Sequence, residues 1–207
     1  MERERMEKYN SDQLMFSIKK RDKDIELTDK GKEQVLKTAK ALKNEKIDLV
    51  FTSPYLRTKQ TTELLLNGMN ISPEYRIDDR LREKEWGILD MYTKKGIMQK
   101  YPEEYERRKR EGKYYYRPPG GESYADIGLR LYSFMGSLIR SGSNKNVLIV
   151  THSVVVKMFR KVIEKLEEED ILNIDKENDP SNCGVTYYQV NPKTDKLNLV
   201  YYNKIFY

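Results

Sequence analysis

The sequence predicts an α/β fold with a mostly parallel, mixed sheet and helices on both faces of the sheet. Two short apolar runs, 48–53 and 147–151, are each followed by a segment with helical periodicity. Two further strand patterns, 184–190 and 196–202, follow one another near the end of the sequence. Strands that alternate with helices favour a parallel sheet, and a closing pair of strands adds an antiparallel part.

The first half of the chain contains two predicted helices around the first strand. Thr28 is a typical N-cap, and apolar residues recur at helical spacing from there to about Asn44. The run 48–53 is almost wholly apolar and stops before a proline, which indicates a buried strand. We expect a helix from about 56 to 66 and irregular structure over 67–95.

The second half repeats the alternation of strand and helix. A charged helix is predicted over 102–111, and the PPGG sequence at 118–121 forces a turn. Ser123 then caps a long helix whose apolar face comprises Ile127, Leu131, Phe134, Met135 and Leu138. The strand at 147–151 leads into a helix over 154–166, and the last two strands flank a hairpin connection at 191–195.

Length and composition fit one domain over residues 1–207. A net charge of +6 favours anionic partners, although 35% charged residues mainly describe a well-solvated surface. Cys183 is the single cysteine, so an internal disulfide is excluded and a reducing compartment is indicated. No apolar stretch approaches the roughly 20 residues of a membrane span, and no signal peptide is recognised. We therefore expect a cytoplasmic protein without a membrane partner.

The single histidine, His152, lies where a predicted strand ends and a helix begins. Free backbone N–H groups and the positive end of the helix dipole attract anions at such a position. Ligands of open α/β sheets bind at this kind of position, although a histidine there is, taken alone, more often structural. One histidine excludes a multi-histidine metal site and any mechanism that needs two histidines from this chain.

Two more residues are candidates for the same chemistry. Arg57 lies one turn into the helix after the first strand, where a guanidinium beside helix N–H groups can clamp a phosphate. Glu83 lies among basic residues close to Trp86, and a carboxyl group partly shielded by an indole can act as an acid. Each of them, taken alone, also fits an ordinary solvated surface residue.

Together, five short stretches form a more specific pattern than any one residue. They read LTDKGKEQ at 27–34, SPYLRTKQT at 53–61, LREKEWG at 81–87, GGES at 120–123 and VTHS at 150–153. Their order and spacing resemble the motifs LTxxGxxQA, SPLxRAxQTA, LxExxxG, GES and VxHGG of the histidine phosphatase superfamily, or phosphoglycerate mutase-like proteins. Ser153 stands where that family usually has glycine, and the resemblance covers about residues 27–190.

The resemblance implies a phosphoglycerate mutase-like three-layer sandwich that hydrolyses a phosphate monoester through a phosphohistidine, with no metal or organic cofactor. By this resemblance Arg57 and His152 bind the phosphate, and His152 and Glu83 are catalytic, with Glu83 protonating the leaving oxygen. The short connection between 86 and 118, with YYYRPPGGES at 114–123, looks like the phosphatase branch rather than the mutases. Residues 96–117 would then form a charged helical insertion near the site, where Tyr116 and Arg117 select the substrate.

The first motif of the family, a strand followed by Arg-His-Gly-Glu with the nucleophilic histidine, is not recognised. It should fall near 3–10, where Arg3 fits as a phosphate-binding arginine but Glu4 takes the place of the histidine. Residues 1–26 are thus expected to be an atypical or truncated N-terminus. We expect the chain as given to bind phosphate or a small phosphorylated substrate and to be inactive or nearly so. It is then either a truncated or mis-started phosphatase, or a pseudophosphatase that binds a phospholigand or a protein.

A second alternative is binding of a polyanion or nucleic acid through 107–117, which interleaves basic and aromatic residues. Four glutamates between 103 and 111 dilute this charge, so nucleic acid is the weaker expectation. The discriminating observation is whether these basic side chains face His152 or point away from it. The sequence does not specify an oligomeric state.

The resemblance also leads to two structural expectations. Arg57, Glu83 and His152 should converge in one pocket, although they are far apart in the sequence. In the family, the strand ahead of the first motif lies in the middle of the sheet. This sheet should therefore show a gap or an unpaired edge where that strand belongs.

Overall fold

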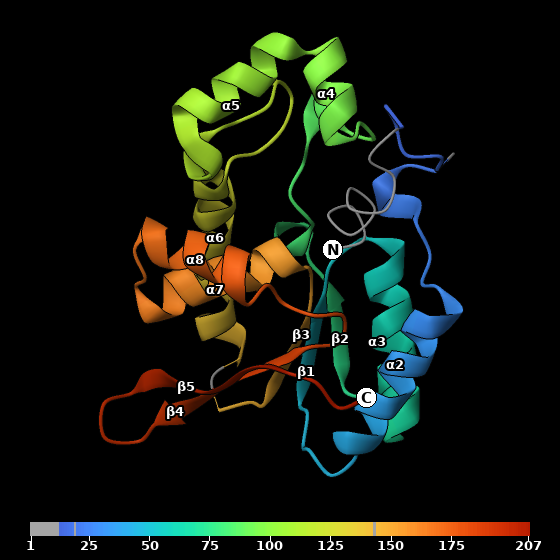
Figure 1. Cartoon of the computed structure of the whole chain (residues 1–207). Helices are drawn as coiled ribbons and strands as arrows, with labels where there is room; N and C mark the ends of the chain where they lie inside the picture. The colour runs from blue at the N-terminus through green and yellow to red at the C-terminus, as the bar shows by residue number, and fades with distance from the viewer. Residues whose placement is uncertain (1–12, 19, 143) are drawn as a thin grey trace.

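A three-stranded parallel sheet in the order β2–β1–β3 lies at the centre of the molecule (Figure 1). The strands are β1 (Leu49–Thr52), β2 (Glu74–Ile77) and β3 (Val147–Val150). The computed structural model describes residues 13–18, 20–142 and 144–207. Residues 3–10, to which the first family motif and Arg3 were assigned, lie outside the described residues.

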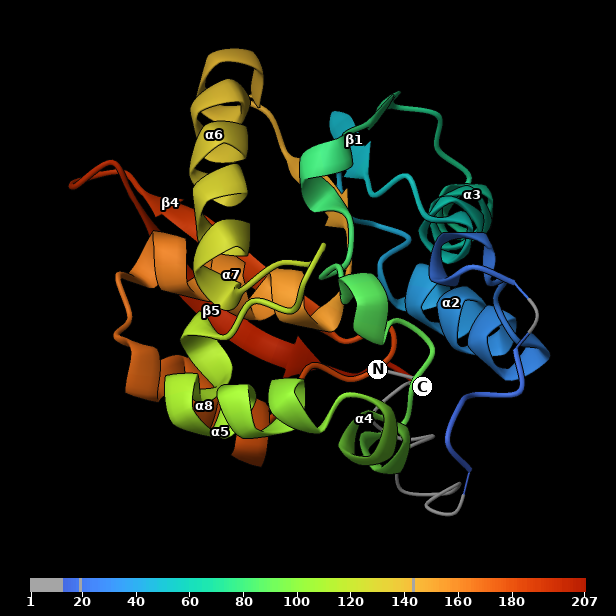
Figure 2. The same cartoon turned by 90° about the horizontal axis from the view of Figure 1, so that it is seen from above.

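Helices cover both faces of this sheet, so the fold has three layers (Figures 1 and 2). One face carries α2 (Asp29–Ala41) and α3 (Leu56–Met69), which pack against each other. The other face carries α6 (Tyr124–Gly142) and α7 (Ser153–Glu164), with α8 (Glu168–Glu177) beside them. The shorter α4 (Lys94–Lys100) and the charged α5 (Pro102–Tyr115) lie above the carboxyl edge of the sheet, at the top of Figure 1.

Side chains that alternate along the strands divide the core into two apolar clusters. Leu49 and Phe51 of β1 pack with residues of α6 and α7, whereas Leu148 of β3 packs with residues of α2 and α3. The first cluster includes Ile127, Leu131, Phe134, Val155 and Met158, and the second includes Val35, Ala39, Leu65 and Met69. Burial of each such side chain contributes about 1.5–3 kcal/mol, so both helical layers are held firmly to the sheet.

The expected helix caps are confirmed by the hydrogen bonds at two helix starts. The Thr28 hydroxyl accepts a bond of 3.1 Å from the N–H of Gly31, at the start of α2. The Ser123 hydroxyl accepts a bond of 3.1 Å from the N–H of Asp126, at the start of α6. Each bond satisfies a backbone donor that has no partner within its helix.

Two sequence-based expectations about the elements are wrong, and one helix was missed. Residues 67–95 are not wholly irregular, because they contain β2 and the first residues of α4. The helix α8 was not predicted. The last two strands, β4 (Val185–Asn191) and β5 (Lys196–Lys204), pair antiparallel as expected, but they form a separate two-stranded sheet instead of completing a mixed one.

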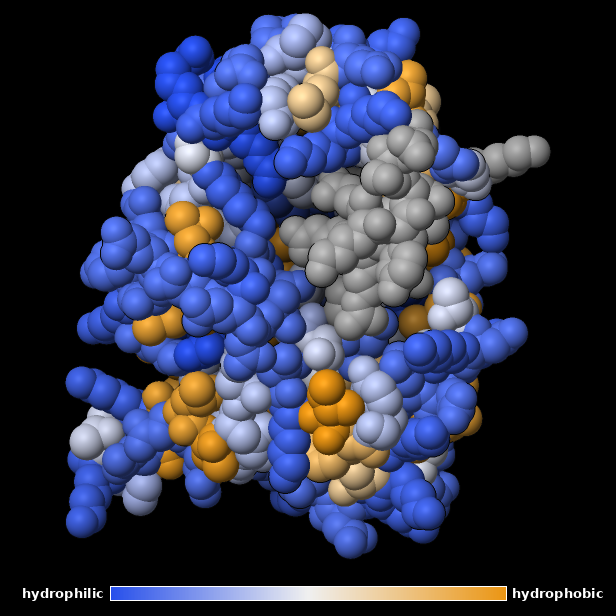
Figure 3. Space-filling model, in the orientation of Figure 1, coloured by the Kyte–Doolittle hydropathy of each residue, from blue (hydrophilic) through white to orange (hydrophobic). Residues whose placement is uncertain are grey.

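The strand β3 is less covered than the central strand β1. All four residues of β1 are buried, whereas all four residues of β3 are only half-buried. Among the described strands β3 pairs with β1 alone. The expected gap for the strand of the first motif stays a prediction, because residues 1–12 lie outside the described residues. Val190 and Val200 of the β4–β5 hairpin are exposed apolar residues. Figure 3 shows apolar surface at the lower left, where this hairpin lies in Figure 1. Within the described residues, no helix has the length and apolar composition that a bilayer span requires.

Candidate phosphate site

The parallel register of β1 and β3 brings two distant segments together at the carboxyl edge of the sheet. Thr52 pairs with Val150, so the residues that follow each strand become neighbours. The N–H of Ser53 continues the ladder by donating to the carbonyl of Val150 over 3.0 Å. His152 therefore lies beside Ser53, and the helices α7 and α3 both begin at this point.

The His152 ring is buried among polar partners. Its Nε2 lies 2.7 Å from the Ser53 hydroxyl, and its Nδ1 lies 3.3 Å from Nη2 of Arg57. The Tyr55 ring meets it edge to face, with 5.0 Å between the ring centroids. Burial and then the positive charge of Arg57 hold the pKa of His152 well below its usual range, and Asp22 offsets this only in part. The ring is therefore neutral at pH 7.

Arg57 lies in the first turn of α3, as expected, and its guanidinium contacts both Asp22 and His152. Its Nη1 donates to the backbone carbonyl of Asp22 over 2.7 Å, and the Asp22 carboxylate lies 3.4 Å from both terminal nitrogens. Asp22 belongs to a short 3₁₀ turn, η1 (Asp22–Asp24). The guanidinium also lies 4.8 Å from the centroid of the Tyr55 ring. An anion that binds Arg57 must therefore share it with Asp22 or displace Asp22.

Glu83 reaches the same site from the loop after β2. One carboxylate oxygen accepts a bond of 2.8 Å from the N–H of Lys84, and the other lies 3.9 Å from Nδ1 of His152. The Thr151 hydroxyl ties this loop to the end of β3 by donating to the carbonyl of Leu81 over 2.8 Å. Arg57, Glu83 and His152 thus lie together, as expected. We call these three residues the phosphate site.

The loop 81–87 is held in place by the turn at 118–121 and the start of α6. The backbones of Glu85 and Glu122 are joined by a 2.9 Å bond, and the Glu122 carboxylate accepts from both Arg82 and Arg130. Gly87 has a φ of +55°, and a Cβ there would lie only 2.0 Å from the carbonyl oxygen of Pro119. Two of the sequence motifs therefore form one unit that positions Glu83.

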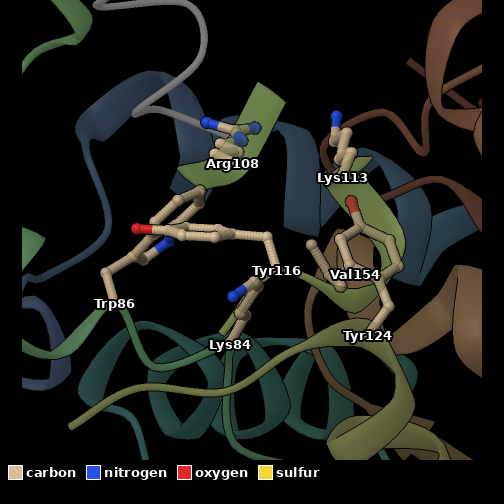
Figure 4. A pocket seen from close by; sticks show the side chains of 7 residues that line it. All are labelled: Lys84, Trp86, Arg108, Lys113, Tyr116, Tyr124 and Val154. Carbon is tan, nitrogen blue, oxygen red and sulfur yellow. The ribbon is translucent and has the colours of Figure 1, made fainter. Parts of the chain in front are cut away.

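A small basic and aromatic cavity is lined by residues that include Lys84 and Val154, which follow Glu83 and His152 in the chain by one and two positions (Figure 4). Its volume of about 30 Å³ has room for a water molecule. Lys84 is buried in its wall, donates to the carbonyl of Glu122 and lies 4.7 Å from the Trp86 ring centroid. Burial and the neighbouring Arg108 lower the pKa of Lys84 to about 8. The full lining is Lys84, Trp86, Arg108, Lys113, Tyr116, Tyr124 and Val154.

The two residues expected to select the substrate lie in different environments. Tyr116 lines the cavity, and its hydroxyl donates to the Glu104 carboxylate over 2.7 Å. Arg117 lies at the surface, where its Nε donates to Asp126 over 2.7 Å. Sequence reasoning missed Lys84 and Arg108 as cations of this cavity. The position of Lys84 between Glu83 and the tryptophan was the available signal.

Residues 14–203 match the family model of the histidine phosphatase superfamily, branch 1. The chain belongs to this superfamily. A 2,3-bisphosphoglycerate-dependent phosphoglycerate mutase of Rhizobium meliloti (strain 1021) is 33% identical over 157 residues, which cover 73% of this chain and 74% of the mutase. Phosphoserine phosphatase 1 of Hydrogenobacter thermophilus is 30% identical over 134 residues, 65% of this chain and 62% of that protein.

A solved structure shows the same fold at lower identity. The complex of a mycobacterial glucosyl-3-phosphoglycerate phosphatase with inorganic phosphate superposes with a TM-score of 0.72 and 21% identity, over 93% of this chain and 94% of that one. The expected phosphoglycerate mutase-like α/β fold is therefore confirmed. Membership of the histidine phosphatase superfamily establishes a phosphatase or mutase lineage, and both activities occur among the relatives named above.

Proposed function

We propose that this histidine phosphatase chain binds phosphate and phosphate monoesters at the phosphate site, and that its lineage activity is hydrolysis through a phosphohistidine. The observation that carries the proposal is the 3.3 Å approach of Arg57 and His152 at the starts of two helices. A guanidinium, an imidazole and two sets of free helix N–H groups meet there, which is a favourable environment for a phosphate group.

The three side chains suit different parts of the transfer reaction. Arg57 and His152 can stabilise the charge on the phosphoryl oxygens, and Glu83 can protonate the oxygen that leaves. Arg3 stays a prediction as a further phosphate ligand. Covalent transfer also needs an imidazole aimed at phosphorus, and this chain has a single histidine, which the clamp already uses. We therefore propose that the chain binds phosphate and phosphate monoesters but hydrolyses the monoesters hardly at all.

Substrate selection would act through the side chains that line the small cavity, since the cavity itself has room for a water molecule only. Lys84 and Arg108 place positive charge there, which favours a phosphate ester whose alcohol part carries a second anionic group. In this proposal Tyr116 shapes the wall of the cavity, and Arg117 acts from the rim, where Asp126 holds it.

Polyanion or nucleic-acid binding is less well supported. Lys109 is ion-paired with Glu106, and Arg107 is ion-paired with Glu104 and Glu111. Arg108 and Lys113 line the small cavity instead of an outer surface. Most of the basic side chains of this segment are thus neutralised by acidic partners or turned toward the cavity, which does not favour a polyanion surface.

Thermal unfolding in increasing inorganic phosphate tests the binding proposal. A ligand of the folded state at a hundred times its Kd stabilises by about 2.7 kcal/mol, so the melting temperature should rise. Arg57→Ala should abolish the rise, whereas Arg140→Ala, which changes an arginine near the far end of α6, should keep it. A melting temperature that stays constant through millimolar phosphate would refute a functional phosphate site.

Hydrolysis of an aryl phosphate tests the activity. The chain as given should be hardly above background, because loss of a nucleophile commonly costs several orders of magnitude in rate. Fusion of an apolar strand ending in Arg-His-Gly ahead of residue 6 should raise both stability and hydrolysis, because β3 pairs with β1 alone among the described strands and can pair with a further strand. A fusion that raises neither would favour a pseudophosphatase that binds a phospholigand or a protein.

A further inference from the structure

The Ser53 hydroxyl contacts Nε2 of His152 and has no role in the reaction described above. Ser53 has no exposed surface, and its hydroxyl oxygen is 2.7 Å from Nε2 of the ring. The same oxygen is 3.4 Å from the N–H of Tyr55, which donates to it. Among the described residues no buried side-chain nitrogen or oxygen lacks a hydrogen-bond partner, so this contact is part of a complete network.

The partners of the two ring nitrogens decide where the proton of His152 lies. A guanidinium can only donate, and Arg57 is within hydrogen-bond distance of Nδ1. In a neutral ring Nδ1 is then the accepting nitrogen, and the proton is on Nε2. Nε2 accordingly donates to the oxygen of Ser53.

We propose that Ser53 is the positioning residue of His152: its oxygen accepts the Nε2 proton, fixes the Nε2–H tautomer and keeps Nδ1 facing Arg57. A serine suits this place because its hydroxyl oxygen is a hydrogen-bond acceptor, and the short side chain brings that oxygen within reach of Nε2. Without it, the Nε2–H group would be buried with no acceptor, which is costly, so the ring would turn or exchange its proton.

This arrangement also prepares the ring for an anion, a step that rests on the proposed function. A phosphate oxygen placed between Arg57 and His152 needs a donor at Nδ1. The neutral ring supplies one by taking a proton at Nδ1 from solvent or from monobasic phosphate, which becomes dibasic. Nε2–H stays bonded to Ser53 in both states, so the ring changes its charge without changing its orientation.

Because His152 is the single histidine, long-range ¹H–¹⁵N NMR shows its tautomer without assignment of other residues. Without phosphate at pH 7.5, we expect a protonated, pyrrole-type Nε2 and a bare, pyridine-type Nδ1. Saturating inorganic phosphate should make both nitrogens pyrrole-type. Ser53→Ala should give intermediate shifts for both nitrogens and weaken phosphate binding about tenfold, the effect of one lost hydrogen bond.

Two further variants separate the hydroxyl from the turn that carries it. Ser53→Thr keeps a hydroxyl and should restore the original pair of shifts. Thr58→Val removes a hydroxyl that donates to the Ser53 carbonyl over 3.0 Å, and should leave both the shifts and the phosphate affinity unchanged. A Thr58→Val spectrum that changes as much as that of Ser53→Ala would assign the effect to the turn and overturn the proposal.

The unmodified chain alone can refute the proposal, even if Ser53→Ala does not fold. A proton on Nδ1 in the absence of phosphate would overturn it, as would a phosphoserine at Ser53 found by mass spectrometry. Ser53→Ala with unaltered shifts and affinity would also overturn it. If the tautomer results hold but phosphate neither binds nor changes the spectrum, the proposed function fails and the positioning of His152 by Ser53 stands.

Discussion

The low pKa of the buried His152 makes the stability of the fold depend on pH. The folded state keeps the ring neutral, whereas the unfolded chain protonates it near pH 6.5. Below that pH the unfolded state binds one more proton than the folded state, so the free energy of unfolding falls as the pH falls. The contribution is complete above about pH 6.5 and is lost toward the lower folded pKa.

The size of this loss follows from the proton linkage. One pH unit corresponds to about 1.4 kcal/mol per proton, so below pH 6.5 the loss approaches about 1.4 kcal/mol for each pH unit over which the folded ring stays neutral. Urea unfolding at several pH values measures it. His152→Gln should remove most of this slope, because carboxyl groups titrate mainly at lower pH. Equal slopes in the two proteins would show that His152 has the same pKa in the folded and unfolded states and refute the reasoning.

Two substitutions near the site test different quantities, the phosphate affinity and the free energy of unfolding. Asp22→Asn should tighten phosphate binding, measured calorimetrically, because Arg57 loses its competing carboxylate; weaker binding would mean that Asp22 positions the guanidinium instead. Gly87→Ala should lower the free energy of unfolding by more than 3 kcal/mol in urea, roughly the upper range of backbone strain alone, because its Cβ would collide with Pro119. Gly112→Ala is the control: its φ is also positive, at +78°, with a ψ of 157°, but no atom lies within 4 Å, so its cost should be that of backbone strain alone, about 1–3 kcal/mol. Equal costs would show that the collision is relieved.

The parts of the fold predicted from sequence are those with strong apolar periodicity. The strands at 49–52 and 147–150 are apolar runs, and α6 has a continuous apolar face. In contrast, β2 has the sequence EYRI with all four side chains exposed, so it carries no burial signal. In α8 only Ile171 is fully buried, so the burial signal is weak. The start of this helix carries a different signal, the reciprocal cap of Glu167 and Asp170.

The candidate site was predictable to the extent that it depends on motifs. Arg57, Glu83 and His152 are each recognisable from their neighbours in the sequence, and they lie together. The partners that tune them are not: Ser53 and Asp22 are ordinary residue types, and their effect comes from strand register and from a turn that no pattern specifies. The separation of β4 and β5 from the central sheet was equally invisible, because strand patterns do not state which strands pair.

The contact between Ser53 and His152 joins residues 99 positions apart in the chain. Closing so long a loop is slow and costs entropy, so contacts of this kind form late in folding. Phosphate that binds here can then act only after the main folding barrier, and it should slow unfolding while leaving the refolding rate almost unchanged. The step of folding at which β1 and β3 pair therefore determines when the chain first becomes able to bind phosphate.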